Sequence, residues 1–212
     1  MPADFATFVF EQLPPPPCRV LEVGCGSGGG LVEELAARGY DVLGVDPEAP
    51  AGERFVQAEF QQVDGEWDAV VAGRVLHHVD PLGEGLDLLA RRAALLVVDE
   101  FAWDRIDAAA MDWYESQHRL LRASGIEPLG PPLLDEWRER HPDLHPHDLV
   151  LRELRARYDE LALEWVPYLH RWLGGPSSEA LEQGLVDARA FPAIGYRWAG
   201  SSTLTTRSSA DA

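Results

Sequence analysis

The chain has 212 residues, of which 46% are hydrophobic, so its length suits one α/β domain with a proper core and not two large domains. Acidic residues number 36 against 18 basic ones, and the resulting formal net charge of −18 would repel a phosphate backbone. We therefore expect no nucleic-acid partner, and no membrane partner either, because no apolar run approaches the ~20 residues of a membrane span.

Further features set expectations about location and chemistry. The N-terminus lacks a basic stretch before its apolar residues, so no signal peptide is expected. The two cysteines, Cys18 and Cys25, are too few for a disulfide framework, which makes a cytoplasmic protein the default. All 18 basic residues are arginines, and this excludes P-loop nucleotide chemistry and catalysis by lysine.

The first hundred residues predict alternating helices and strands. Apolar residues at helical spacing indicate a helix over residues 3–13, and the prolines at 14–17 then form a stiff, extended connector. A second helix is expected over residues 29–38 and a third after Asp80-Pro81, since proline suits the first helical turn. Apolar runs predict five strands, over residues 19–23, 41–45, 54–58, 67–72 and 94–99.

The plan changes after the fifth strand, because residues 101–157 separate it from the next one. This stretch contains helical patterns near residues 105–123, 132–140 and 147–157. Long connections at the carboxyl edge of a sheet commonly cover a site, so we interpret residues 101–157 as a helical cap over the substrate. An ordinary packing insertion is the alternative.

The remaining residues complete one domain. A sixth strand is expected over residues 158–166, a helix over 178–190 and a seventh strand over 193–199, while residues 165–170 fit either a loop or the end of the sixth strand. The composition of residues 200–212 indicates a flexible tail. The predicted division is an N-terminal helix and connector over 1–18, a main domain over 19–199 and this tail.

The segment LEVGCGSG, residues 21–28, carries the strongest functional signal. It predicts a buried strand and then a turn in which Gly24, Gly26 and Gly28 remove the β-carbons that would keep a ligand away from the backbone. Asp46 follows the next strand, and at the shared sheet edge its carboxylate could accept both hydrogen bonds of a ribose diol. The first half of the chain is therefore predicted to bind a nucleoside cofactor.

Two kinds of nucleoside cofactor fit these glycines. Gly24, Gly26 and Gly29 satisfy G-x-G-x-x-G, the pattern of dinucleotide-binding sites, although glycines alone are weak evidence. Glu22 lies inside the strand, two residues before the first glycine, and would repel a pyrophosphate. This acid favours a different family.

Five short motifs occur in an order that points to that family. They are LEVGCGSG (21–28), GVDP (44–47), QAEF (57–60), WDAVVAGRVLHHV (67–79) and LLVVDE (95–100). Together they resemble the motifs of class I S-adenosylmethionine-dependent methyltransferases, particularly the small-molecule branch, over residues 19–100. The resemblance implies an α/β fold of the Rossmann-like, doubly wound type. Its seven-stranded, mostly parallel sheet would have the order 3-2-1-4-5-7-6, with strand seven antiparallel and the helical cap inserted after strand five.

The resemblance also implies which residues hold the cofactor, S-adenosyl-L-methionine. Asp46 would hold the ribose hydroxyls, Glu22 would orient the methionine end, and Glu59 would accept the adenine exocyclic amine, where the family more often has aspartate. The remaining residues would contact the methionine end or pack beside the adenine: Gly24, Cys25, Gly26, Ala72 and Gly73 for the former, Pro47 and Phe60 for the latter.

Methyl transfer depends on in-line placement of the acceptor and exclusion of water, with a base when the nucleophile is protonated. His77 and His78 lie just after the fourth strand, where the family places substrate-facing residues, and imidazole suits a general base. His78 is preferred if only one of them acts, and structural roles for both are the alternative. Glu100 is a third candidate, for a substrate contact or a base, with a loop acid near a helix start as the alternative.

The predicted cap offers further residues with functional and ordinary interpretations. Trp113, Tyr114 and His118 could touch substrate, and packing is the alternative for the two aromatic residues. The segment 141–148 holds three histidines and two acids, which could ligate zinc. Its two prolines and the entry to the next helix favour a structural role, so no metal is predicted.

The sequence therefore predicts a cytoplasmic enzyme, a monomer or homodimer, that methylates a small, neutral or cationic metabolite at oxygen or nitrogen. A nicotinamide-dependent oxidoreductase is the alternative from another class, although a Tyr-x-x-x-Lys pair is absent. The third hypothesis is a methyltransferase-like binding module without turnover.

Overall fold

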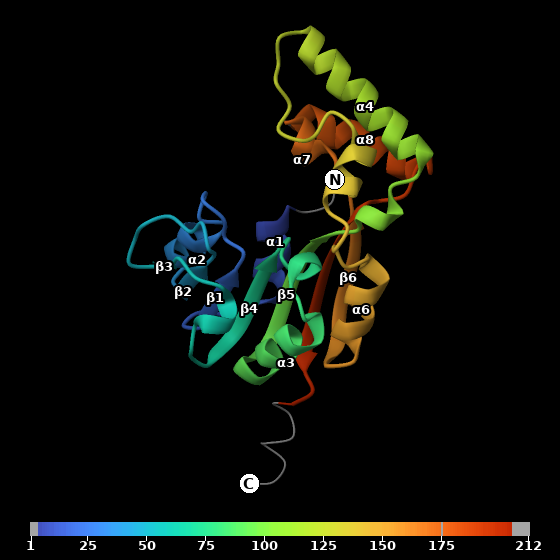
Figure 1. Ribbon diagram of the computed structural model, residues 1–212. Coiled ribbons are helices and arrows are strands. Elements are labelled where there is room, and N and C mark those ends of the chain that lie inside the picture. Colours follow the sequence, from blue (N-terminus) through green and yellow to red (C-terminus); the bar gives the residue numbers. More distant parts are fainter. Residues whose placement is uncertain (1–3, 175, 205–212) are drawn as a thin grey trace. The chain divides into compact units, whose positions relative to one another are not determined.

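The computed structural model describes residues 4–174 and 176–204, in which seven strands form one sheet, and Figure 1 shows the strands with the helices around them. The strand order is β3-β2-β1-β4-β5-β7-β6 with β7 antiparallel, which confirms the predicted fold class. The strands are β1 (Arg19–Val23), β2 (Asp41–Val45), β3 (Phe55–Val56), β4 (Trp67–Gly73), β5 (Ala93–Phe101), β6 (Tyr158–Val166) and β7 (Gly195–Ser202).

Helices connect these strands. The α-helices are α1 (Phe5–Gln12), α2 (Val32–Ala37), α3 (Leu82–Arg92), α4 (Ala108–Ala123), α5 (Leu134–Arg140), α6 (His147–Arg155), α7 (His170–Leu173) and α8 (Pro176–Asp187). Three single turns of 3₁₀-helix are η1 (Phe60–Gln62), η2 (Leu76–His78) and η3 (Trp103–Arg105). Within the described residues, no helix combines the length and apolarity that a membrane crossing requires.

The chain divides into two compact units. The first, called here the sheet unit, comprises the described residues up to Glu100, Asp148–Leu163 and the described residues from Arg197 to Leu204. The second, the helical unit, comprises Phe101–His147 and Glu164–Tyr196.

Parallel pairing aligns the carboxyl ends of the central strands in the sheet unit. Val23 at the end of β1 is the partner of Val45 in β2 and of Ala72 in β4, and Gly73 at the end of β4 is the partner of Asp99 in β5. The residues that follow β1, β2 and β4 therefore lie along one edge, together with the last residues of β5.

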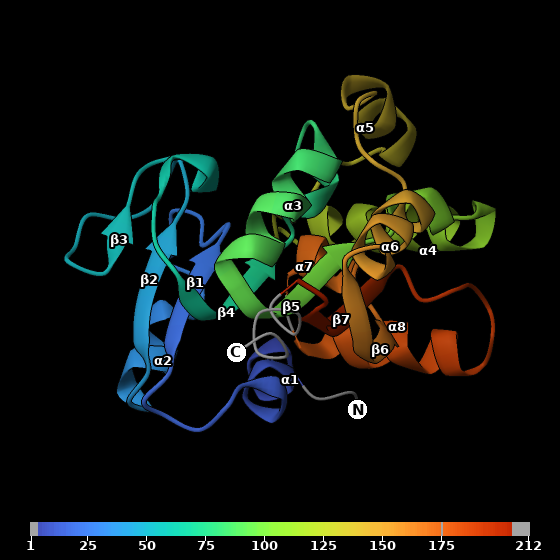
Figure 2. The same cartoon turned by 90° about the horizontal axis from the view of Figure 1, so that it is seen from below.

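Helices cover both faces of the central strands (Figure 2). Phe8 and Val9 of α1 and Val32 and Leu35 of α2 form one buried cluster with side chains from one face of the sheet. Those sheet residues are Val20, Val42, Ala69, Val71, Leu95 and Val97. Helix α3 lies on the opposite face and buries Leu82, Leu86 and Leu89.

The helical unit has a core of its own, rich in aromatic rings. Phe101 stacks on Tyr168 at a centroid distance of 4.2 Å and meets Trp172 edge-on at 5.1 Å. Leu134 and Tyr114, from α5 and α4, complete the buried cluster. Four of the seven tryptophans of the chain pack against this cluster: Trp103, Trp113, Trp137 and Trp172.

Several predicted boundaries shift for identifiable reasons. Helix α2 begins at Val32 and not near residue 29, because Gly29 and Gly30 have φ of +80° and +54°, outside the helical region. Strand β3 has two residues where five were expected, since Ala58 N already turns back to Val56 O at 3.1 Å.

Other differences concern the second half of the chain. Strand β5 runs to Phe101 and not to residue 99, so Glu100 lies inside the strand, whereas it was predicted to follow the strand directly. Strand β7 extends to Ser202, into the predicted tail, because the Ser202 hydroxyl donates to Ala90 O at 2.8 Å. Residues 205–212 of that tail lie outside the described residues. Helix α7 was not predicted.

Candidate functional site

The glycine turn after β1 packs closely against the end of β4. Gly24 has φ of +80°, and its amide donates to Val45 O at 2.9 Å. A β-carbon on Gly24 would lie 3.0 Å from Gly73 O and 3.1 Å from the β-carbon of Val75. Only glycine therefore fits at the first position of the turn.

The next part of the turn is bare backbone facing open space. A β-carbon added to Gly26 or to Gly28 would meet no atom within 4 Å. These two glycines are therefore dispensable for packing within the chain, and their backbone can be approached closely by a ligand. An adenosyl cofactor that contacts the backbone here fits this open surface.

Glu22 holds the second half of the turn in place. Its side chain is buried, and both carboxylate oxygens accept from Leu31 N, at 2.8 and 2.9 Å. Burial raises the pKa of Glu22 to about 7, against the lowering effect of the Leu31 hydrogen bond. A β-carbon on Gly30 would lie only 2.0 Å from one Glu22 oxygen, so Gly30 is required for this contact.

Asp46 and Pro47 lie directly after β2, at the same edge. Asp46 is half-buried, and its Oδ1 accepts from Glu48 N at 2.8 Å, while Pro47 is exposed. Cys25, in contrast, is 6% exposed and belongs to the buried cluster below the turn, where burial raises the pKa of its thiol to about 11. Only the backbone of Cys25 is thus placed to contact a ligand.

Two of the residues predicted to lie near the adenine, Glu59 and Phe60, have different surroundings. Glu59 is exposed and precedes η1. Phe60 is 3% exposed and points into the sheet unit, where its ring would be 3.4 Å from a β-carbon on Gly85 of α3. The Phe60 ring is therefore a core element, whereas the Glu59 carboxylate faces solvent.

The ends of β4 and β5 bring together the predicted base candidates. Glu100 is fully buried; one of its carboxylate oxygens accepts from Leu76 N at 2.6 Å and the other lies 2.5 Å from His77 Nδ1. His77 is buried, whereas His78 is exposed, and the two rings are 4.2 Å apart between centroids. Ala72 is fully buried and Gly73 ends the strand.

The aromatic candidates of the predicted cap lie in the helical unit, in packing roles. The Tyr114 hydroxyl donates to Pro131 O at 2.7 Å, and burial raises the pKa of this phenol. Trp113 packs beside Phe191 at a centroid distance of 5.4 Å. His118 is buried, with Nε2 3.3 Å from Gly130 O.

The histidines of segment 141–148 interact with nearby groups of the helical unit. His141 stacks on Trp137 and its Nδ1 lies 2.8 Å from Trp137 O. His147 Nδ1 lies 2.7 Å from Asp104 Oδ2. In the described part of the chain, no group of three or more histidine, cysteine, aspartate or glutamate residues is placed to hold a metal ion.

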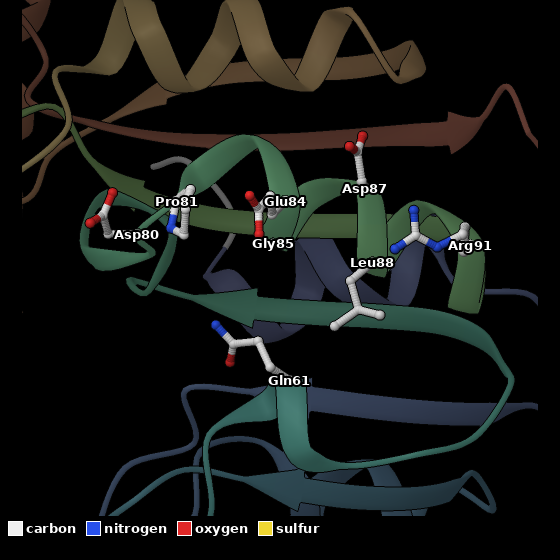
Figure 3. Close-up of a pocket in the computed structure, with 8 residues that line it drawn as sticks. All are labelled: Gln61, Asp80, Pro81, Glu84, Gly85, Asp87, Leu88 and Arg91. Atoms are coloured by element: carbon white, nitrogen blue, oxygen red, sulfur yellow. The ribbon is translucent and has the colours of Figure 1, made fainter.

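A separate hollow of about 530 Å³ lies between α3 and η1 of the sheet unit (Figure 3). The acids Asp80, Glu84 and Asp87 line it from α3 and the residues before it, with Gln61 of η1 opposite. Pro81, Gly85, Leu88 and Arg91 complete the lining. None of these residues was predicted to bind a ligand.

Two residues at the glycine turn were not predicted from the sequence. Gly30 is the third of three consecutive glycines, and the length of this run was the signal that could have found it. Arg74 follows Gly73 directly and adopts φ of +58°, which no local sequence pattern indicates. Both lie in the sheet unit, beside residues that were predicted.

The fold and this edge define the class of protein. A doubly wound sheet carries a bare glycine turn after β1 and an acid after β2, which is the arrangement of a nucleoside-cofactor site. Class I methyltransferases share this arrangement.

Comparison with known proteins places the chain within that class. A family model described as a methyltransferase domain matches residues 2–170, and the chain belongs to this family of S-adenosylmethionine-dependent methyltransferases. S-Adenosylmethionine is accordingly its cofactor.

Curated relatives match over a shorter stretch. The ubiquinone biosynthesis O-methyltransferase of Azorhizobium caulinodans is 36% identical over 95 residues, which cover 37% of this chain and 36% of the relative. The protein of the same name from Acinetobacter baylyi is 39% identical over 82 residues, covering 30% of this chain and 34% of the relative. The chain thus matches about a third of the length of these relatives.

Solved structures agree on the fold. Magnesium protoporphyrin IX methyltransferase from Synechocystis, with bound S-adenosylhomocysteine, superposes with a TM-score of 0.52 at 17% identity, over 94% of this chain and 80% of that one. An S-adenosylmethionine-dependent methyltransferase from Mesorhizobium loti gives a TM-score of 0.58 at 12% identity, over 94% and 98% of the two chains.

Proposed function

We propose that this chain transfers a methyl group from S-adenosylmethionine to an oxygen of a small metabolite. The observation that carries the proposal is the bare glycine turn at the same sheet edge as Asp46 and the His77–Glu100 pair. Oxygen is favoured over nitrogen because the curated relatives are named as O-methyltransferases, although they match over only part of their length.

Within this proposal, the chain's own residues bind and orient the cofactor. Asp46 accepts from the ribose hydroxyls, and the exposed Glu59 accepts from the adenine amine. Glu22 shapes the turn around the methionine end through Leu31. When bound, S-adenosylmethionine supplies a methyl group on a positively charged sulfur, which is already a good leaving group. Binding and orientation are therefore most of what the protein must contribute.

In this proposal a histidine acts as the general base that removes the proton of the acceptor. A carboxylate only accepts hydrogen bonds, so Glu100 assigns the proton of neutral His77 to Nδ1 and leaves Nε2 as the basic nitrogen. Glu100 is fully buried and acts through His77, as a positioning residue. The same geometry shifts our preference for the base from His78 to His77.

The proposal is tested by following transfer of the labelled methyl group from S-adenosylmethionine to a metabolite extract, with mass-spectrometric identification of the product. A methyl ether among the products supports the proposal, and a methylated amine moves the acceptor atom to nitrogen. Cofactor binding without any product, across all pools of metabolites, would support the non-catalytic module instead. Titration with reduced nicotinamide dinucleotide separates the oxidoreductase alternative, for which saturable binding is required.

The two histidines give a matched pair of variants. We expect His77→Gln to lower the rate of methyl transfer by about 10²- to 10⁴-fold, the usual range for a general base, and to leave S-adenosylhomocysteine affinity unchanged. His78→Gln should keep most of the activity. The opposite ranking of the two variants would return the role of base to His78.

The acceptor class, a monomeric or homodimeric state and the cytoplasmic location remain predictions from the sequence. The acidity of the chain supports a neutral or cationic acceptor as the general expectation. One arginine at the candidate site departs from this expectation.

A further inference from the structure

Arg74 is held against the glycine turn by its neighbours. The carbonyl oxygen of Gly73 and the β-carbon of Val75 are the two groups that a β-carbon on Gly24 would touch, at 3.0 and 3.1 Å. The Arg74 amide donates to Asp99 O at 2.7 Å. The backbone of residue 74 is therefore fixed between β1 and β5, at the edge where the cofactor is expected.

The backbone conformation of Arg74 is unusual for a residue with a side chain. Arg74 and Arg189 are the non-glycine residues with positive φ in the described ranges, both at +58°. Arg189 follows α8, and its amide donates to Val186 O at 2.9 Å, so its conformation ends a helix in an ordinary way. Arg74 instead follows a strand, where no helix end explains the conformation. Strained residues of this kind cluster at functional sites.

The Arg74 side chain is exposed and has no hydrogen bond or ion pair to another residue in the described ranges 4–174 and 176–204. Several other arginines of the sheet unit are paired, among them Arg19 with Asp41 at 3.2 Å and Arg157 with Asp87 at 2.6 Å. In a chain with twice as many acids as bases, a guanidinium without an acidic partner beside a ligand site is available for an anion.

We propose that Arg74 binds a carboxylate at the glycine turn. A guanidinium matches a carboxylate in shape and charge and can bind it through two parallel hydrogen bonds. Two ligands of the proposed reaction could bring that group: the amino-acid end of the methyl donor, or an acceptor that carries a carboxylate. The inference rests on the proposed function, because both sources are its reactants.

The decisive variant is Arg74→Gly. Glycine adopts φ of +58° without strain, so this substitution removes the guanidinium and keeps the backbone of the edge. Arg189→Gly is the matched control, since it changes the same charge at the same φ in the helical unit. Circular dichroism of both variants confirms that each is folded before any ligand is added.

The donor arm compares two nucleosides by calorimetric titration. S-Adenosylhomocysteine carries the amino-acid carboxylate, and methylthioadenosine lacks it. If Arg74 binds the donor, Arg74→Gly weakens S-adenosylhomocysteine binding by about 10- to 100-fold and leaves methylthioadenosine unchanged. Arg189→Gly binds both like the wild type.

The acceptor arm uses protein saturated with S-adenosylhomocysteine. Para-hydroxybenzoate is the probe, and para-hydroxybenzyl alcohol is the same molecule without the carboxylate. If Arg74 binds the acceptor, Arg74→Gly leaves the affinity for S-adenosylhomocysteine unchanged. It weakens the binding of para-hydroxybenzoate by about 10- to 100-fold and has no effect on the binding of the alcohol.

Either pattern supports the inference and names the source of the carboxylate. Equal affinities of wild type and Arg74→Gly for S-adenosylhomocysteine, with no carboxylate-specific loss in the acceptor arm, overturn it. Failure of the wild type to bind either nucleoside is a different result, since it removes the proposed function itself.

Discussion

Glu22 makes the stability of the protein depend on pH. Its pKa is raised from 4.5 to about 7 in the folded chain because the carboxyl is buried, so the folded state keeps a proton that the unfolded state has already released. Stability is therefore highest below pH 4.5 as far as this group is concerned, falls as the pH rises to about 7, and is level above that. The loss across this window is on the order of 3 kcal/mol.

Urea unfolding of the wild type and of Glu22→Gln between pH 4.5 and 8 measures this contribution. The amide of Gln cannot ionise and still accepts from Leu31 N. We therefore expect that the stability of the variant lacks the decrease with rising pH that Glu22 causes in the wild type. Parallel pH dependence in the two proteins would show that Glu22 is not the source.

Two glycines of the turn provide a contrast between folding and binding. A β-carbon at Gly30 would displace the Glu22 carboxylate and meet an unfavourable φ of +54°, so Gly30→Ala should cost at least about 2 kcal/mol of stability. Gly28→Ala places its methyl group in open space and should change stability by less than about 0.5 kcal/mol.

The same pair separates the two roles in ligand binding. We expect Gly28→Ala to weaken S-adenosylhomocysteine although its unfolding curve matches the wild type, because the added methyl group occupies the surface left open for the ligand. Unchanged affinity in Gly28→Ala would mean that the ligand does not approach this part of the turn.

The candidate site could be predicted from the sequence as far as strand ends determine it. Gly24, Asp46, His77 and Glu100 reach one edge because parallel strands align their carboxyl ends. Side-chain direction was not predictable from the motifs. The pleat and local packing direct the side chains of Cys25 and Phe60 into the core. The buried Glu100 carboxylate contacts His77.

At the scale of elements, Glu182 of α8 organises the chain around α7. Its buried carboxylate accepts from three consecutive amides, those of Tyr168, Leu169 and His170, at 2.8, 3.0 and 2.7 Å, and lies 3.0 Å from His170 Nδ1. Glu182→Ala removes the acceptor of these amides in a buried position and should destabilise the protein by about 3 kcal/mol.

Gln183→Ala is the control for this prediction, because within the described part of the chain the Gln183 amide group donates only to Asp187 on its own helix, at 2.6 Å. Chemical denaturation of both variants measures the difference. Equal stability would mean that the carboxylate contributes little to the fold of the helical unit.

These contacts also explain which elements the sequence could predict. Strands β1, β2 and β6 have the predicted bounds, since each is a short run flanked by turn-forming residues or by a helix end. Helix α7 depends on a carboxylate twelve residues further along the chain, which no local pattern reveals. Helix α2 starts late because of glycine backbone angles, which propensity alone does not fix.

At the scale of the whole molecule, the hydrophobic pattern predicts strands but not their order. The order β3-β2-β1-β4-β5-β7-β6 was expected from the resemblance to methyltransferases, and the structure confirms it. The net charge of −18 likewise describes the average surface and not the binding edge, where Arg74 lies exposed beside the glycine turn. Composition therefore constrains partners only broadly.

Binding of an adenosyl cofactor at the sheet edge is tested most directly by calorimetric titration of S-adenosylhomocysteine into three proteins. Asp41 begins β2 and Asp46 directly follows it, and among the described residues the Asp41 side chain makes only an exposed ion pair with Arg19. We predict saturable binding to the wild type, the same affinity in Asp41→Ala, and a loss of about 10- to 100-fold in Asp46→Ala with the fold intact. No binding to the wild type, or wild-type affinity in Asp46→Ala, would contradict the account.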